Sequence, residues 1–153
     1  KHIQQFLAEG HLRWDSLGEF LALAVSIEDI AEKTNNEAAR IVASALNDAN
    51  SRYLENNKSP SRKVNEHDNR GSHFYLAMYW AEALAANTID SKLAKKFAAA
   101  AKALADNTKI INKELIAAQG SAVNIGGYYR PNISMAANAM RPSKTLNTII
   151  DAI

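Results

Sequence analysis

The fold of this chain is decided by one long stretch rich in aromatic residues and alanine, His73-Phe74-Tyr75-Leu76-Ala77-Met78-Tyr79-Trp80-Ala81-Glu82-Ala83-Leu84-Ala85-Ala86. Nearly every residue in it is apolar, and a helix that is hydrophobic all round is buried on most sides. Ser72 precedes the stretch and is a suitable N-terminal cap. We therefore predict a central helix over 73–86, surrounded by other helices.

The segments on either side repeat apolar residues at helical spacing. Helices are predicted over 3–9 with an end at Gly10, over about 17–33, from a cap at Asn36 to about 54, from Asp90 or Ser91, from Asp106 or Asn107 to Gly120, from Asn132 or Ser134 to 140, and from Pro142-Ser143 to near 153. Ser16-Leu17-Gly18-Glu19 matches a capping box, in which Ser16 accepts a backbone N–H and Glu19 reaches back. No strand pattern appears. We predict a mainly α fold, a compact multi-helix bundle in a single module over 1–153.

The composition is that of a soluble globular domain. Of 153 residues, 47% are hydrophobic and 22% charged, and the formal net charge is +2. This length suits one domain with a sizeable core, and so small a charge does not indicate a nucleic-acid binder. No apolar run reaches the roughly 18 residues of a membrane span. We expect no nucleic acid and no membrane among the partners. The absence of cysteine excludes disulfides and is compatible with a reducing cytoplasm, where we expect the protein.

A polar, cationic loop is predicted between the helix that ends near 54 and the central helix. It spans residues 56–71, and its bases are Lys58, Arg62, Lys63 and Arg70. Pro60 and Gly71 are expected to bend its backbone. A guanidinium offers a fixed fork of donors and a lysine offers a mobile charge. The loop therefore suits an anion, and its mixture of bases, hydroxyls and amides favours phosphate.

Signals for catalysis and for metal binding are weak. The four histidines lack the spacing and the acidic neighbours of a metal site. No serine has the surroundings of a catalytic nucleophile. Gly126-Gly127 lacks the glycine spacing of a phosphate loop, and we expect a turn there that packs Tyr128 and Tyr129 against the helices. We predict no catalytic and no metal-binding residue in this chain.

The triplet Arg13-Trp14-Asp15 has two interpretations. An aromatic ring between a cation and a carboxylate presents a flat face, a charge and an acceptor together, which suits a nucleotide. Alternatively, Trp14 belongs to the core, and Asp15 lies near the N-terminus of the following helix, where negative charge is favourable. The residues alone leave both interpretations open.

Several motifs, in order along the chain, resemble one enzyme family. They are His11-Leu12-Arg13-Trp14-Asp15-Ser16-Leu17-Gly18-Glu19-Phe20-Leu21-Ala22-Leu23-Ala24, Asn57-Lys58-Ser59-Pro60-Ser61-Arg62, Asp68-Asn69-Arg70-Gly71-Ser72-His73-Phe74-Tyr75, Gly127-Tyr128-Tyr129-Arg130-Pro131 and Met140-Arg141-Pro142-Ser143. Over nearly its whole length the chain is similar to the carboxyl-terminal part of the bacterial monomeric NADP-dependent isocitrate dehydrogenases. Its start, Lys1-His2-Ile3, has neither an initiator methionine nor a signal peptide, so we expect a fragment of a longer polypeptide.

The resemblance implies a single-chain enzyme that oxidatively decarboxylates isocitrate to 2-oxoglutarate, using NADP and a magnesium or manganese ion. It implies that this bundle forms part of a larger α/β enzyme domain. The residues that bind isocitrate and metal, and the acid/base residues, are then expected upstream, outside this chain. The fragment alone is expected to be inactive, and apolar faces exposed by the missing segments would favour self-association.

The resemblance also implies which residues bind the cofactor. His2, Arg13 and Arg62 match the family's positions around the adenosine 2′-phosphate of NADP, and Asp15 with neighbouring Trp14 falls in the adenosine-contacting segment. A carboxylate cannot help to bind a phosphate directly. We therefore expect Asp15 to orient Arg13, or to accept a hydrogen bond from the ribose or the adenine amino group.

Three further residues carry over from the family only as structural or supporting residues, namely Lys58, Arg70 and His73. The alternative to a cofactor site is a helical anion-binding or protein-interaction module, in which the cationic loop docks an acidic protein or a nucleic-acid backbone. Such a basic patch would bind polyanions with a steep salt dependence and would not distinguish NADP from NAD.

Overall fold

The computed structural model describes all 153 residues and contains helices but no strands. The helices are α1 (His2–Glu9), α2 (Leu17–Thr34), α3 (Glu37–Glu55), α4 (Asn69–Ala86), α5 (Ser91–Asp106), α6 (Thr108–Ala117), α7 (Ile133–Met140) and α8 (Lys144–Asp151). The predicted mainly α fold is confirmed. No helix combines the length and the apolar character needed to cross a membrane.

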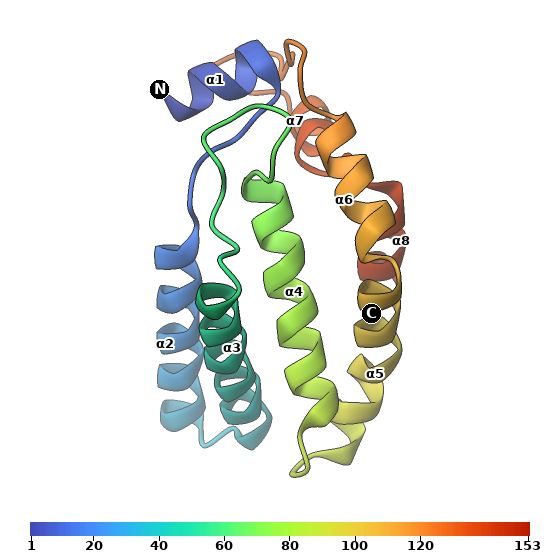
Figure 1. The fold of residues 1–153 in the computed structure, drawn as a ribbon. Helices are drawn as coiled ribbons and strands as arrows, with labels where there is room; N and C mark the ends of the chain where they lie inside the picture. Colours follow the sequence, from blue (N-terminus) through green and yellow to red (C-terminus); the bar gives the residue numbers. More distant parts are fainter.

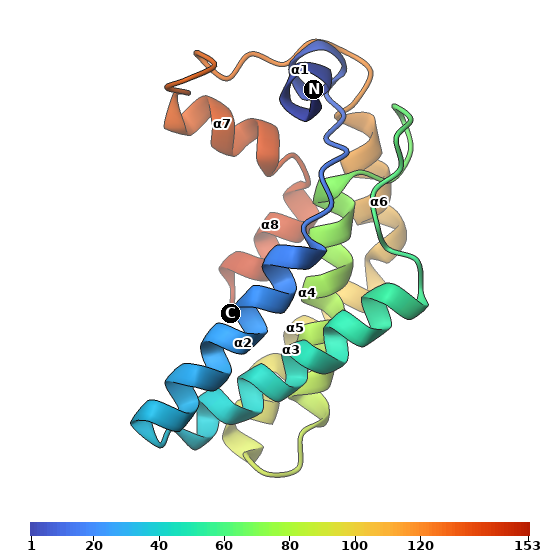
Figure 2. The ribbon, with the colours of Figure 1, turned by 90° about the vertical axis from the view of Figure 1, so that its left-hand side faces the viewer.

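The four long helices, α2, α3, α4 and α5, form the body of the molecule (Figure 1). The α2–α3 hairpin packs against α4 through α3, and α5 packs against the other side of α4. The short helices α6 and α8 lie beyond, in contact with α5. α1 crosses one end of the bundle, where the 10–16 linker and the loop that follows α3 also run, and Figure 2 shows α7 at the same end. That end therefore gathers irregular segments from distant parts of the sequence.

The core is built around α4, as predicted for the central helix. Phe74, Met78, Tyr79 and Ala81 of this helix are all buried. They belong to one cluster with Phe20, Ala24, Leu46, Ala49, Tyr53, Leu76, Ala101, Leu104, Ile111 and Leu115. Nearer its C-terminal end α4 contributes Leu84 to a smaller cluster with Ile41 and Ala45 of α3. A helix that packs on most of its circumference explains why this stretch has almost no polar residues.

The start of α4 differs from the prediction. The cap is Asp68, whose Oδ1 accepts from Arg70 N at 3.0 Å, and the helix begins at Asn69. Ser72 lies within the first turn, and its Oγ donates to the carbonyl of Lys58 at 2.6 Å. Both residues suit a cap, and the carboxylate prevails because it also pairs with the Arg70 side chain. The cationic segment 56–71 is therefore loop only to Asp68, and Gly71 lies in a helix and makes no bend.

The predicted capping box at α2 is wrong, although the helix begins at Leu17 as expected. Ser16 is the N-cap residue, but its side chain accepts no helical N–H and instead accepts from Asn69 Nδ2 at 2.8 Å. Asp15 Oδ1 accepts from Leu17 N at 3.1 Å. Glu19 turns away from the backbone and binds Trp14. A tertiary partner of Ser16 and the local contacts of Asp15 and Glu19 therefore replace the capping box at this helix start.

In the C-terminal third the cap is Asn132, one of the two predicted candidates, and the last helix begins after Ser143, close to the predicted start at Pro142-Ser143. Each of these two residues accepts a backbone N–H of the helix that it precedes. The helix expected to reach Gly120 ends at Ala117, because Gly120 N donates to the carbonyl of Glu9 at 2.8 Å and not to its own helix. Between these helices Gly126 and Gly127 have positive φ, as expected of a turn.

The expected packing of the two tyrosines beside this turn is wrong. Tyr128 is 54% exposed and Tyr129 is 91% exposed. The two rings contact each other edge to face, with centroids 4.9 Å apart, so each is the other's aromatic neighbour. The turn holds them outside the helical core.

Candidate cofactor-binding site

A hollow of about 560 Å³ lies at the α1 end of the bundle. It is lined by His2, Arg13, Trp14, Asp15, Pro60 and Arg62. These residues come from three segments, namely the start of α1, the linker before α2 and the loop after α3. The structure thus brings all five residues assigned to cofactor binding around one cavity, although they span sixty positions of sequence.

The cationic side chains of this hollow have no acidic partner. Neither Arg13 nor Arg62 forms an ion pair. Arg13 Nε and His2 Nδ1 are buried and make no hydrogen bond. Leaving a buried polar atom without a partner costs about 1–3 kcal/mol. Two such atoms, together with guanidinium groups free of carboxylates, fit a site for an anionic ligand.

The indole of Trp14 is held in a defined position at the edge of the hollow. Its Nε1 donates to Glu19 Oε1 at 2.9 Å. The His2 ring meets it edge to face, with centroids 5.4 Å apart. Trp14 is 47% exposed and is not part of the core, so the core interpretation of this residue is wrong. A fixed and half-exposed indole is suited to stacking against a planar base.

Asp15 is oriented from the bundle. Its Oδ1 accepts from Tyr53 Oη at 3.0 Å, in addition to Leu17 N. Burial raises the pKa of Tyr53 to about 12, so the phenol keeps its proton at physiological pH and donates to the carboxylate. Asp15 forms no ion pair with Arg13. Of the two roles expected for Asp15, accepting a hydrogen bond from a ligand fits this geometry better than orienting Arg13.

The rest of the cationic segment serves the fold. Arg70 is 4% exposed and pairs with Asp68, with Nη2 2.7 Å from Oδ2. Its other donors reach main-chain carbonyls, that of Gly10 at 2.6 Å and that of Ala139 at 2.9 Å. The expectation that Arg70 belongs to an anion-binding loop is therefore wrong, and its supporting role is that of an anchor between three segments.

Lys58 and His73 also have contacts within the fold. Lys58 Nζ lies 4.0 Å from the centroid of the Tyr75 ring, a cation–π contact. Nδ1 of His73 lies 2.9 Å from the carbonyl oxygen of Asn69, and the His73 ring packs edge to face on Phe20. Neither residue lines the hollow.

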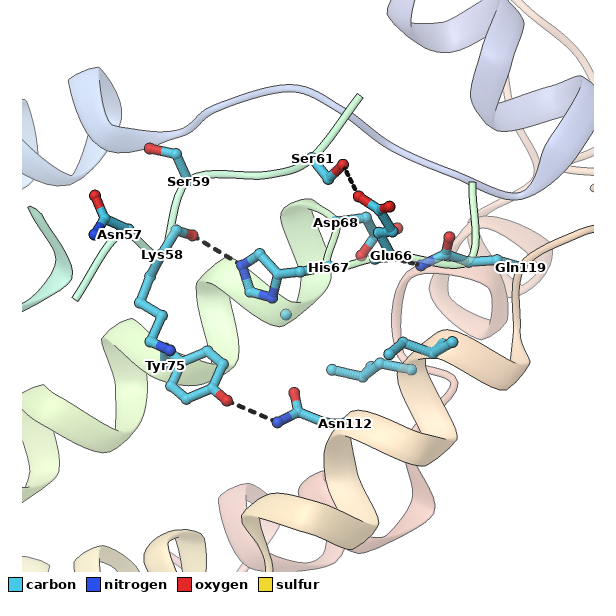
Figure 3. A pocket seen from close by; sticks show the side chains of 13 residues that line it. Asn57, Lys58, Ser59, Ser61, Glu66, His67, Asp68, Tyr75, Asn112 and Gln119 are labelled. Atoms are coloured by element: carbon cyan, nitrogen blue, oxygen red, sulfur yellow. Dashed lines mark hydrogen bonds between the residues drawn. The ribbon is translucent and has the colours of Figure 1, made fainter. Parts of the chain in front are cut away.

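A second cavity, of about 400 Å³, adjoins the same loop (Figure 3). Ser61, His67, Tyr75 and Asn112 are among the residues that line it. His67 Nε2 is 2.8 Å from the Lys58 carbonyl, and Tyr75 Oη accepts from Asn112 Nδ2 at 2.7 Å. Ser61 therefore faces one cavity while the next residue, Arg62, lines the other. The loop backbone at Ser61–Arg62 therefore runs between the two cavities.

Sequence reasoning missed the residues that hold the hollow in shape. They are Gln5, whose Nε2 donates to the Arg62 carbonyl at 3.2 Å, Glu19 behind Trp14, and Tyr53 behind Asp15. The sequence pattern assigns Glu19 to a cap and gives Tyr53 no role in the site. The polar tip of Tyr53 was the available signal, because a buried phenol needs a hydrogen-bond partner.

No group of three or more His, Asp or Glu side chains in the chain is placed to hold a metal ion. The residues present thus do not fit the magnesium or manganese ion that the family resemblance implies. The residues of the hollow do fit NADP, because unpartnered donors on Arg13 and His2 and the fixed ring of Trp14 suit a phosphorylated nucleoside.

Comparison with known proteins gives a consistent result. The family model described as monomeric isocitrate dehydrogenase matches residues 1–151. Isocitrate dehydrogenase (NADP) 2 of Colwellia maris is 57% identical over 153 residues, which is 100% of this chain and 21% of that protein. Isocitrate dehydrogenase (NADP) of Azotobacter vinelandii is 57% identical over 150 residues, 98% of this chain and 20% of that protein. Isocitrate dehydrogenase (NADP) 2 of Mycobacterium tuberculosis is 54% identical over 153 residues, 100% and 20% respectively. The chain thus spans 20–21% of the length of these relatives.

Proposed function

Because this chain belongs to the monomeric isocitrate dehydrogenase family, we propose that it recognises the adenosine 2′-phosphate of NADP in such an enzyme. The observation that carries the proposal is the convergence of His2, Arg13 and Arg62 on one hollow without any acidic partner. The names of the relatives, which specify NADP, support the choice of ligand.

The chemistry of the site favours NADP over NAD. The 2′-phosphate is the only group that distinguishes them, and it brings up to two negative charges. Each charge-assisted hydrogen bond from a guanidinium contributes about 1.5–3 kcal/mol. Trp14 offers a face for the adenine, and Asp15 an acceptor for a ribose hydroxyl or the adenine amino group. Binding of NAD would leave the cations facing no anion, which selects against it.

In the whole enzyme, the proposed activity is the oxidative decarboxylation of isocitrate to 2-oxoglutarate. NADP, when bound, supplies the ring that accepts the hydride. The residues of this chain bind and orient the adenosine end of the cofactor. Following the family resemblance, isocitrate and the magnesium or manganese ion are expected to bind to segments outside the chain. We therefore expect the 153-residue chain alone to produce no NADPH from isocitrate.

Calorimetric titration of the purified chain with NADP, and in parallel with NAD, tests the proposal. We expect NADP to bind and NAD to bind at least about tenfold more weakly. Arg62→Ala and Arg13→Ala should each weaken NADP binding by about tenfold or more and leave NAD binding unchanged. Lys63→Ala is the matched control, because Lys63 is an exposed base of the same loop that does not line the hollow.

Two results would contradict the proposal. They are equal affinity for the two cofactors, or an effect of Lys63→Ala as large as that of Arg62→Ala. Binding of neither cofactor would mean that the site needs segments outside the chain, and the titration would then be repeated on the whole enzyme. Binding of RNA or polyphosphate with a steep salt dependence and no preference for NADP would instead favour the anion-binding module.

A further inference from the structure

His11 lies fully buried behind the hollow, and each of its ring nitrogens faces an oxygen. Nδ1 is 2.7 Å from Gln119 Oε1, and Nε2 is 2.8 Å from the carbonyl oxygen of Ser61. Ser61 is the residue before Arg62. The histidine thus joins the 10–16 linker to the loop that carries one of the two arginines of the hollow, and to the segment after α6.

The amide of Gln119 has only one orientation that satisfies its neighbours. Its Oε1 accepts from the backbone N–H of Asn65 at 2.8 Å. Its Nε2 donates to the backbone carbonyl of Glu66 at 2.9 Å (Figure 3). A flipped amide would set donor against donor at Asn65 and acceptor against acceptor at Glu66. The atom that faces His11 Nδ1 is therefore the acceptor Gln119 Oε1. The atom that faces Nε2 is the carbonyl oxygen of Ser61, which can only accept.

Two acceptors require two donors. A neutral imidazole has one N–H, whereas the imidazolium form has an N–H on both nitrogens. With a neutral His11, one ring nitrogen would present a lone pair to an oxygen at less than 3 Å, in a site without water access. The imidazolium form makes both contacts hydrogen bonds, and the charge strengthens both.

We propose that His11 is held as an imidazolium and positions the Ser61–Arg62 backbone for the cofactor. This inference rests on the proposed function for its effect on NADP, but the protonation state of His11 stands on geometry alone. His11 touches no ligand in this scheme. It acts through the Ser61 carbonyl, while Gln5 holds the Arg62 carbonyl from the other side.

The charged groups around His11 come from every segment that packs on it. The Asp68–Arg70 pair binds the main chain on both sides of the ring, with Asp68 accepting from Leu12 N and Arg70 donating to the Gly10 carbonyl. On the loop side the titratable neighbours are His67 and Glu66, whose carboxylate accepts from the Ser61 hydroxyl.

Loss of the His11 proton would unpair one of the two acceptors. If the Ser61 contact is lost, Arg62 loses its fixed backbone, and the fork geometry that matches a phosphate is no longer preset. NADP affinity should then fall, whereas NAD affinity, which does not depend on Arg62, should not. A residue that served stability alone would weaken both cofactors together.

Nitrogen NMR of the histidine-labelled chain at neutral pH tests the protonation state directly. We expect both ring nitrogens of His11 to have the shifts of protonated nitrogens. His67 is the internal control, since its Nε2 faces the Lys58 carbonyl and the Ser72 hydroxyl, and burial lowers its pKa, so it should have one protonated nitrogen. A neutral His11 spectrum would overturn the inference, whether or not NADP binds.

The positioning role is tested by His11→Gln, which offers one side-chain donor group, with His73→Gln as control. NADP affinity of the His11 variant should be lower by roughly tenfold, with NAD affinity unchanged, and the loss of NADP affinity towards alkaline pH should be shallower than in the parent chain. If the two cofactors weaken equally, or if the pH profiles coincide, His11 does not position Arg62. If the isolated chain binds neither cofactor, the site needs segments outside the chain, and the NMR result still decides the protonation state of His11.

Discussion

Arg62 and Arg70 come from the same cationic stretch, and the fold uses them in opposite ways. Arg70 is buried, paired with Asp68 and bound to two carbonyls, so its charge is fully used within the protein. Arg62 is exposed, forms no ion pair and lines the hollow with His2 and Arg13. The number of bases in a loop therefore says little about binding. An arginine is available to a ligand only where the fold provides it with no acceptors.

The largest effect is expected when Arg70, the buried partner of Asp68, is replaced. Arg70→Met leaves the Asp68 carboxylate buried and unpaired, and we expect a loss of about 3–5 kcal/mol in the free energy of unfolding, measured by urea denaturation. Arg62→Ala is the control and should change that free energy by less than about 0.5 kcal/mol. Equal effects of the two variants would show that Arg70 is no anchor.

Gly71 lies in the first turn of α4, next to the buried Arg70, and is tightly packed. A Cβ at this position would lie 2.6 Å from His67 Nδ1, so Gly71→Ala must displace the imidazole that binds the Lys58 carbonyl. We expect a loss of about 1–2 kcal/mol in the free energy of unfolding. Gly18→Ala is the matched control, since a Cβ there meets nothing within 4 Å, and it should stabilise α2 by about 0.5–1 kcal/mol. Stabilisation by both variants would contradict this packing.

At the hollow, Arg62→Lys tests whether binding needs only the positive charge of Arg62 or also the planar shape of its guanidinium. Lysine keeps the positive charge but lacks the planar fork that binds phosphate through two parallel hydrogen bonds. We expect NADP affinity to fall by about tenfold in a calorimetric titration, less than with alanine, and stability to be unchanged. Full affinity in the lysine variant would mean that Arg62 acts only as a point charge.

The smallest expected effect concerns pH. Burial lowers the pKa of His67 from its ordinary value of 6.5. The unfolded chain therefore takes up this proton at higher pH than the folded chain. The contribution of a neutral His67 is present above about pH 6.5 and is lost as the pH falls below it. Urea denaturation of the parent and of His67→Gln at acid and neutral pH should show a shallower acid loss in the variant. Identical losses of stability in the two chains would show that His67 does not contribute to the acid sensitivity.

How much of this arrangement the sequence predicts depends on the range of the interactions. Periodicity and local caps predicted the helices, and Asn36, Asp90, Asn132 and Ser143 do accept the expected helical N–H groups. The predicted cap Ser72 is wrong, because the nearby Asp68, which also accepts from the distant Leu12 N, caps the helix instead.

The candidate site shows the same limit. The assignment of His2, Arg13 and Arg62 came from family resemblance, because no spacing rule connects residues so far apart. The distinction between Arg62 and Arg70 was not visible, since it depends on the Gly10 and Ala139 carbonyls. Tyr128 and Tyr129 have aromatic side chains typical of a core, but they follow a turn with positive φ at both glycines and lie exposed outside the core.

The contacts that hold the α1 end have a consequence for the order of folding. His11 meets partners 50 and 108 positions away, and Arg70 reaches Gly10 across 60 positions. By contrast, the α2–α3 hairpin closes through the short turn at 35–36. Long loops are closed at a larger entropic cost, so contacts of this kind form late. The hairpin and α4 should be protected early in pulse-labelled hydrogen exchange. The cation-lined hollow would then be the last part of the chain to take shape.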